Sequence, residues 1–114
     1  MLEMVRARRA SKKGIKLIGN ERYSEASFVF TSARELYRKV GDYEKAAVAS
    51  IEAKAAMKLA KKKSQSRTPS APPSEKVQAV IIDRWNARIR EMTYDKSGMM
   101  SLAVDNEKKL AHKH

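Results

Sequence analysis

Residues 36–47 read LYRKVGDYEKAA and predict the end of one helix and the start of another. Gly41 can take the left-handed backbone conformation that commonly ends a helix, and Asp42 is a favourable N-cap for the next one. The stretch RYSEAS at 22–27, downstream of Gly19, repeats this arrangement twenty residues earlier. Each copy has a tyrosine near its start, an acid in its first turn and a small residue where two helices would approach. The repeat therefore predicts short antiparallel helices joined by tight turns.

Three helices are expected around the two turns, at about 3–18, 21–40 and 43–62. The second, with Asn20 as its expected cap, has the clearest pattern, because apolar residues that repeat every seven positions share one arc of it. These residues are Tyr23, Ala26, Val29, Phe30, Ala33, Leu36, Tyr37 and Val40. Such a wide apolar arc predicts a core helix with a broad buried face.

The third expected helix has two apolar faces, and two faces require two neighbours. One face would pack inside the bundle, while the other could line a groove for a partner. The groove residues are Val48, Ile51, Ala55 and Leu59. The alternative is that helix propensity alone explains the many alanines of this helix.

Residues 64–74 are rich in serine and proline, a composition typical of an extended linker. Ser74 would cap a fourth helix at about 75–92, and an apolar stripe on that helix consists of Ile81, Trp85, Ile89 and Met92. This stripe must be buried, either on the preceding helices or on a partner. The remaining residues form either a short helix or a short strand. The chain thus divides into a three-helix unit at 1–63, a linker at 64–74, and an amphipathic helix with a basic tail at 75–114.

The 114 residues include 25 Lys and Arg against 13 Asp and Glu, a formal net charge of +12. An excess of this size favours a polyanionic partner such as RNA. The first helix carries a basic stripe with no glutamate four residues along to neutralise it, and a second basic run follows the third helix. The candidate anion-binding residues are Arg6, Arg9, Lys13, Lys16, Lys61, Lys62 and Lys63. The alternative is that these cations are only solvated.

The chain contains no cysteine, and its only histidines are His112 and His114. Disulfides and thiol catalysis are thereby excluded, and the usual nucleophile–base pairs lack a placed histidine. Its four glycines are isolated, so no glycine-rich phosphate loop is present. No apolar run reaches the roughly 18 residues that a membrane-spanning helix needs. We expect a non-enzymatic intracellular protein, cytoplasmic or alternatively mitochondrial, with no catalytic residues, cofactor, metal site or small-molecule substrate.

The turn at 36–47 resembles the junction between the two helices of a tetratricopeptide repeat, where Tyr, Gly, Tyr and Ala pack antiparallel helices. Ala53 stands where that repeat has a later small residue. The twenty-residue spacing of the two turns departs from the roughly 34-residue period of that family. It favours one closed three-helix unit instead of a solenoid.

Such a unit, at about 3–62, resembles the MIT domain (microtubule interacting and trafficking). Tyr23-Ser24-Glu25-Ala26 is similar to the Tyr-x-Glu-Ala with which helix two of that family opens, and a Pro/Ser linker usually follows the bundle there. The first helix of this chain is more basic than the family pattern. The resemblance implies an all-α fold, an antiparallel three-helix bundle that binds short motifs of partner proteins in grooves between its helices.

Two functions follow as expectations. The first is an adaptor that binds a partner helix or short linear motif in the groove of the third helix. The second is a small basic RNA-binding component of a ribonucleoprotein, such as a ribosome-associated factor, whose affinity would fall steeply with salt. Attachment of the first helix to an anionic membrane surface is a third possibility.

Overall fold

The computed structural model describes residues 2–65, 73–94 and 98–112, and this part of the chain forms five α-helices and no strand. The helices are α1 (Leu2–Gly19), α2 (Tyr23–Lys39), α3 (Tyr43–Gln65), α4 (Glu75–Thr93) and α5 (Met99–His112). The predicted all-α class is therefore confirmed. For the stretch after α4, the sequence left a short helix and a short strand as alternatives, and the structure has a helix there. Residues 66–72 of the expected linker lie outside the described residues.

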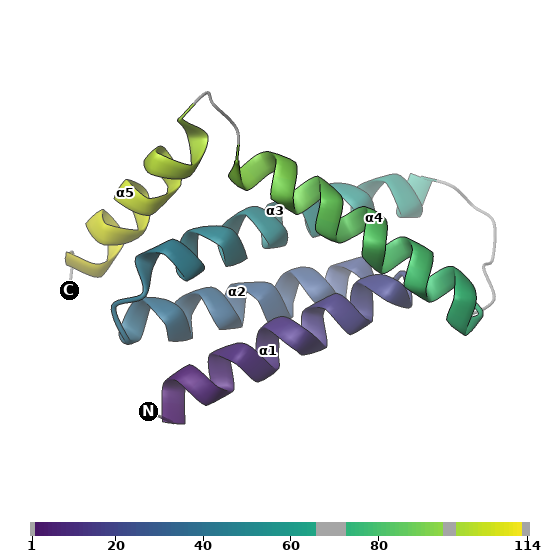
Figure 1. The fold of residues 1–114 in the computed structure, drawn as a ribbon, viewed down its shortest axis with the longest axis horizontal. Coiled ribbons are helices and arrows are strands. Elements are labelled where there is room, and N and C mark those ends of the chain that lie inside the picture. Colours follow the sequence, from purple (N-terminus) through teal and green to yellow (C-terminus); the bar gives the residue numbers. More distant parts are fainter. Residues whose placement is uncertain (1, 66–72, 95–97, 113–114) are drawn as a thin grey trace.

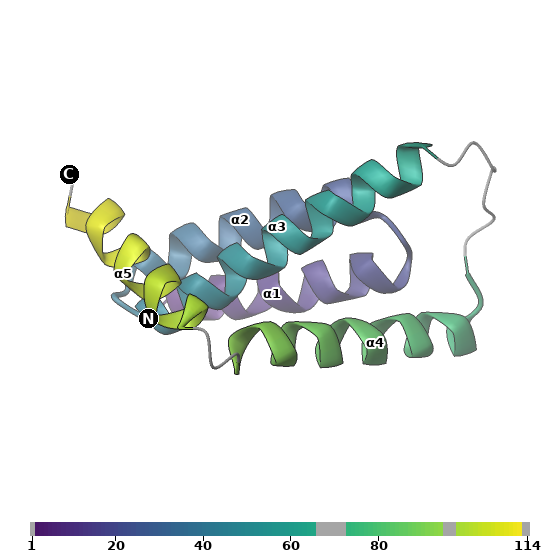
Figure 2. The ribbon, with the colours of Figure 1, turned by 90° about the horizontal axis from the view of Figure 1, so that it is seen from above.

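The first three helices run antiparallel, and α2 lies between α1 and α3 and packs along both (Figure 1). Helix α4 returns across α1 and α3 as a second layer, as the view from above shows (Figure 2). Helix α5 packs mainly on α3, with smaller contacts to α2 and α4. The two C-terminal helices thus cover different stretches of α3.

The two turns have the same hydrogen-bonding pattern, in which the chain closes the preceding helix with a left-handed residue. In the first, the Arg22 amide donates to Leu17 O at 2.9 Å and Glu21 has φ 60°. In the second, the Asp42 amide donates to Tyr37 O at 3.0 Å and Gly41 has φ 80°. This is the Schellman arrangement, which satisfies the last carbonyls of a helix. The repeat recognised in the sequence is thus a repeat of backbone geometry.

The caps follow the sequence prediction at two of three places. Asp42 Oδ1 accepts a hydrogen bond from the Lys45 amide at 3.2 Å, and Ser74 Oγ accepts one from the Val77 amide at 3.4 Å. The prediction that Asn20 caps α2 was wrong. Its side-chain amide donates to Lys16 O at the end of α1, and the N-cap of α2 is Arg22 without a side-chain cap. Because Glu21 takes the left-handed position, α2 begins three residues after Asn20.

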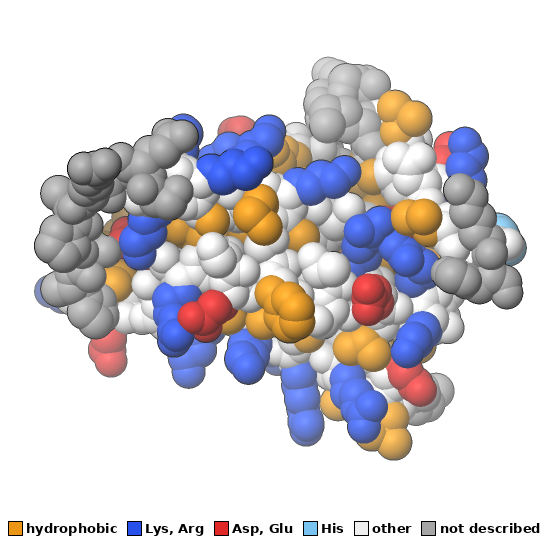
Figure 3. Space-filling model, turned by 180° about the vertical axis from the view of Figure 1, so that it is seen from behind, with side chains coloured by type: hydrophobic (Ala, Val, Ile, Leu, Met, Phe, Trp, Pro, Cys, Tyr) orange, Lys and Arg blue, Asp and Glu red, His pale blue; other side chains and the backbone are white. Residues whose placement is uncertain are grey.

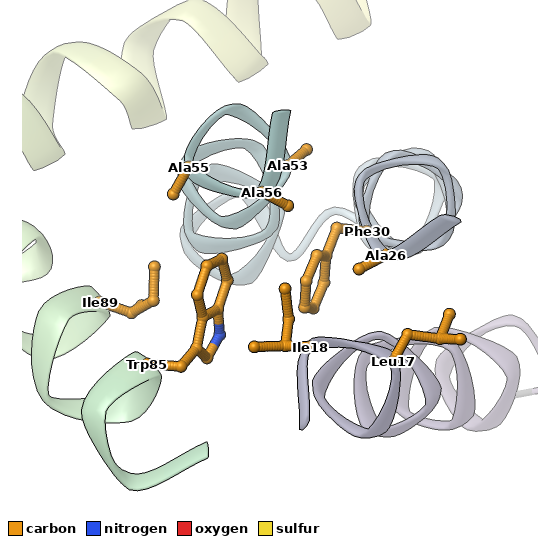
Figure 4. Packing of buried hydrophobic residues seen from close by; sticks show 9 residues of the cluster. All are labelled: Leu17, Ile18, Ala26, Phe30, Ala53, Ala55, Ala56, Trp85 and Ile89. Atoms are coloured by element: carbon orange, nitrogen blue, oxygen red, sulfur yellow. The ribbon is translucent and has the colours of Figure 1, made fainter. Parts of the chain in front are cut away.

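The main hydrophobic cluster joins four helices (Figure 4). Its buried members are Leu17, Ile18, Ala26, Phe30, Ala53, Ala55, Ala56, Trp85 and Ile89. The rings of Phe30 on α2 and Trp85 on α4 stack with their centroids 5.8 Å apart and their planes at 9°. Removing a buried aromatic of this kind typically costs about 3–5 kcal/mol. Trp85 therefore anchors α4 on the other helices.

The predicted apolar arc of α2 is confirmed as its buried or half-buried side, with one exception at the helix end. Val40 is 37% exposed because it is the C-cap of α2, beyond the last full turn. Phe28, which lies off the arc, is 75% exposed. A second cluster continues the core along α2 and consists of Ala7, Ala33, Tyr37, Ala46 and Ala49.

Two glycines of α1 allow its neighbours to approach closely. A Cβ on Gly14 would lie 2.5 Å from the Phe30 ring, and one on Gly19 would lie 2.8 Å from Ile82 of α4. Both distances are shorter than side-chain atoms tolerate, so any larger residue would displace a packed neighbour. The small residues of α1 thus set how closely α2 and α4 pack against it.

Candidate partner-binding groove

The four predicted groove residues all lie on the face of α3 that α4 and α5 approach. Ala55 is 2% exposed, whereas Val48, Ile51 and Leu59 are half-buried and pack against the cluster that contains Trp85. The chain's own C-terminal helices therefore cover much of this face. What remains open must be found between those helices.

The stripe of α4 packs on the chain itself. Trp85 is 3% and Ile89 8% exposed, and Ile81 and Met92 are half-buried against the same cluster. Of the two alternatives that the sequence left open, burial on the preceding helices is the one observed. The structure thus brings two sets of candidate residues together, those of the groove and those of the stripe.

An open pocket of about 960 Å³ remains between α3 and α5, beside the end of α4. We call it the α3–α5 groove. Its apolar lining consists of Ile51, Ala55, Met92, Leu102, Ala103 and Leu110. Leu102 is 63% exposed although it is a large apolar side chain. Two of the four predicted groove residues, Ile51 and Ala55, therefore line an accessible apolar site, and α5 supplies the wall that the sequence did not predict.

The rim of the α3–α5 groove is basic. Its polar lining includes the cations Arg34, Lys54, Lys58, Lys108 and Lys109 and a single carboxylate, Glu107. Lys54 and Lys58 stand one turn apart on α3, and Lys108 and Lys109 lie on α5. All four lysines are exposed. The groove therefore combines an apolar floor with positively charged edges.

Glu107, which lines the groove, joins α5 to α2. Its side chain is 1% exposed, and its carboxylate oxygens accept hydrogen bonds from Arg34 Nε at 2.7 Å and from the Arg38 guanidinium at 2.6 and 2.9 Å. Two cations thus compensate one buried carboxylate, as a buried charge requires. The sequence does not reveal Glu107 as a buried residue, because the apolar pattern after Gly98 is weak. The one local hint is that Arg34 and Arg38 stand one turn apart on α2.

A second buried acid, Glu52 on α3, contacts Trp85. The residue is 7% exposed, and the Trp85 indole N–H donates to its carboxylate at 3.4 Å. Burial raises the pKa of the Glu52 carboxyl to about 7, and the hydrogen bond from Trp85 acts in the opposite direction. Sequence reasoning missed Glu52 too, because nothing local distinguishes it from a surface glutamate on an alanine-rich helix.

The predicted basic stripe of α1 is fully exposed. Arg6, Arg9, Lys13 and Lys16 face solvent, as do the neighbouring Arg8 and Lys12. Lys and Arg side chains gather along the lower edge of the molecule in Figure 3, where α1 runs. Among the described helices, α1 packs on α2 and α4, and neither covers this side. The stripe is therefore accessible to a polyanion.

The lysine run at the end of α3 lies near the first turn. Lys61, Lys62 and Lys63 are exposed, and Lys63 Nζ donates to Glu21 O at 2.9 Å and lies 6.0 Å from the centre of the Tyr23 ring. This contact puts the run at the end of the molecule where α1 finishes. The lysine run can therefore extend the basic surface of α1. Lys63 also stabilises the first turn through its hydrogen bond to Glu21 O.

No family model, curated protein or solved structure matches the chain. The resemblance to MIT domains and tetratricopeptide repeats therefore stays a prediction. Over residues 2–65, 73–94 and 98–112, no three metal-ligating side chains lie close enough together to hold an ion. None of the helices in those ranges combines the length and apolarity needed to cross a bilayer.

Proposed function

We propose that the chain is a non-enzymatic interaction module that binds a partner helix or short peptide motif in the α3–α5 groove. The observation that carries the proposal is an apolar groove of about 960 Å³, open to solvent and walled by two helices. In this proposal α1, α2 and α3 are the three-helix bundle similar to MIT and tetratricopeptide units. Grooves between helices are a common seat for amphipathic helices.

Leu102 supports a peptide-sized occupant. A large apolar side chain that is 63% exposed within a continuous apolar lining has unburied surface that a partner could cover. Ile51 and Ala55 contribute from α3, while Val48 and Leu59 pack against the main hydrophobic cluster and do not line the groove. The proposed site therefore keeps half of the groove expected from the sequence and gains Leu102 and Leu110 from α5.

The proposal is tested by selecting displayed random peptides on the folded chain. Selected peptides should lose at least about tenfold in affinity on a Leu102→Asp variant, because a charge in an apolar contact is costly. Phe28→Asp is the matched control, since Phe28 is an exposed apolar residue on α2 that does not line the groove. Failure to select any peptide, or equal loss in the two variants, would contradict the proposal.

A second candidate function, RNA binding, is favoured by the exposed cations of α1. Six side chains of one sign on one helix face form the electrostatic footprint expected for a phosphate backbone. Binding of an RNA duplex should weaken by orders of magnitude between about 50 and 200 mM salt if several of these cations contact phosphates.

The double variant Arg9→Glu/Lys13→Glu should abolish RNA binding. The groove double variant Lys54→Glu/Lys109→Glu changes the net charge equally and should preserve more of it. If both double variants weaken RNA binding equally, the binding depends on net charge and not on the α1 stripe. Binding that is insensitive to salt would remove this candidate.

A further inference from the structure

We propose that the occupant of the α3–α5 groove is an acidic amphipathic helix. Its apolar stripe would pack on Ile51, Leu102 and Leu110, and its carboxylates would pair with lysines on both rims. This inference rests on the proposed function and specifies the chemistry of the partner.

Within the described helices, the chain itself does not neutralise the charges of the four rim lysines. Among the described residues, no acidic side chain forms an ion pair with Lys54, Lys58, Lys108 or Lys109. The single carboxylate of the lining, Glu107, is already used by Arg34 and Arg38. The groove therefore presents positive charge on two opposite edges. An acidic ligand would be attracted to it and a basic one repelled.

The spacing of the rim lysines suits a helical ligand. Lys54 and Lys58 are four residues apart on α3, so their side chains project from the same side of the helix at successive turns. Glutamates four residues apart on a bound helix would be spaced by the same distance, about one helical turn. The molecule already uses this geometry once, because Arg34 and Arg38, also four apart, hold a glutamate of α5. Cations on two rims fit a ligand with several charges along its length.

The positive charge of the groove disfavours two other kinds of occupant. A second copy of the chain would bring another net charge of +12 to a basic groove. A small anionic amphiphile with one carboxylate could pair with one rim but would leave the lysines of the other rim unpaired. An acidic helix matches both the floor and the edges.

The test uses two synthetic peptides about 16 residues long, enough for four helical turns. Both carry the same leucine stripe, and their other positions are glutamate-rich in one and lysine-rich in the other. Fluorescence anisotropy with the full chain at low salt should show that the acidic peptide binds at least about tenfold more tightly. Lys54→Glu/Lys58→Glu should abolish that preference. Lys12→Glu/Lys13→Glu, the matched change on α1, should leave it in place.

The outcomes separate the two proposals. If neither peptide binds and display selection also fails, the proposed function falls. If both peptides bind equally and Leu102→Ser weakens both, the groove stands and the acidic partner is wrong. Loss of the preference in the α1 variant would show non-specific attraction and overturn the inference. Two other results would also overturn the inference. One is displacement of the acidic peptide by an equal concentration of dodecanoate. The other is a dimer of the chain that the Leu102→Ser substitution dissociates.

Discussion

Glu21 occupies, in the first turn, the left-handed backbone position that Gly41 occupies in the second. A side chain in this conformation costs roughly 1–2 kcal/mol, whereas glycine adopts it freely at some cost in unfolded-chain entropy. The Lys63 contact goes to the Glu21 backbone oxygen and does not need the side chain. The two turns therefore differ in strain although they share their hydrogen bonds.

This difference predicts that Glu21→Gly raises the free energy of unfolding by about 0.5–1 kcal/mol. Gly41→Ala should lower it by about 1 kcal/mol, because it introduces the strain that Glu21 carries. Urea unfolding followed by circular dichroism measures both. A destabilised Glu21→Gly protein would mean that the Glu21 side chain makes a contribution larger than its backbone strain.

Glu52 makes stability depend on pH. Its pKa is about 7 in the folded chain against about 4.5 for a glutamate in the unfolded chain, so the folded state binds more protons between these two pH values. Stability should therefore be highest below about pH 4.5 as far as this group is concerned, and should fall by about 3 kcal/mol as the pH rises to about 7 and above.

The measurement is the difference in unfolding free energy between the natural chain and Glu52→Gln at about pH 5 and about pH 8. The variant should gain relative stability at the higher pH, because its amide carries no buried charge yet can still accept from Trp85. Glu91→Gln, an exposed change on α4, serves as the control. A difference that does not change with pH would show that Glu52 titrates normally.

At the scale of elements, α3 explains how one helix serves several neighbours. One of its faces packs on α2, while the other receives Trp85 and Ile89 of α4 along one stretch and α5 along another. Two apolar faces were visible in the sequence, and so was the stripe of α4. Their mutual contact could not be predicted, because either face could equally have met another molecule. The α3–α5 groove is the part of this face that no helix fills.

One buried carboxylate, Glu107, pairs α5 with two arginines of α2. Glu107→Gln should lower the free energy of unfolding by about 2–3 kcal/mol, because Arg34 and Arg38 lose a charged acceptor and remain partly buried. Hydrogen exchange should show lost protection in α5, with α1 and α2 nearly unchanged. Asp105→Asn, at an exposed position of the same helix, should leave protection intact. Unchanged exchange in α5 of Glu107→Gln would show that its apolar contacts suffice.

At the scale of the whole molecule, whose formal net charge is +12, two of the surfaces that carry exposed cations are the α1 face and the α3–α5 groove. The α1 face has cations without an apolar floor, which suits a phosphate backbone. The α3–α5 groove has an apolar floor between cations, which suits an acidic helix. Composition alone indicated a polyanionic partner and could not separate these two kinds of surface. Their separation lets charge reversals on one surface act as controls for the other.

The sequence by itself determined the first four helices, the two turns and the central position of α2, but it left the last stretch open between a helix and a strand. These depend on local features: the apolar period, the Asp42 and Ser74 caps, and Gly41 at a left-handed position. One local prediction, that Asn20 caps α2, was wrong. Glu21 adopts the left-handed backbone conformation instead, and the N-cap of α2 is Arg22. Only the tertiary structure decided that α4 packs on the other helices, that Glu52 and Glu107 are buried, and which part of α3 stays open. Those outcomes depend on contacts between residues far apart in the chain, and local patterns do not specify them.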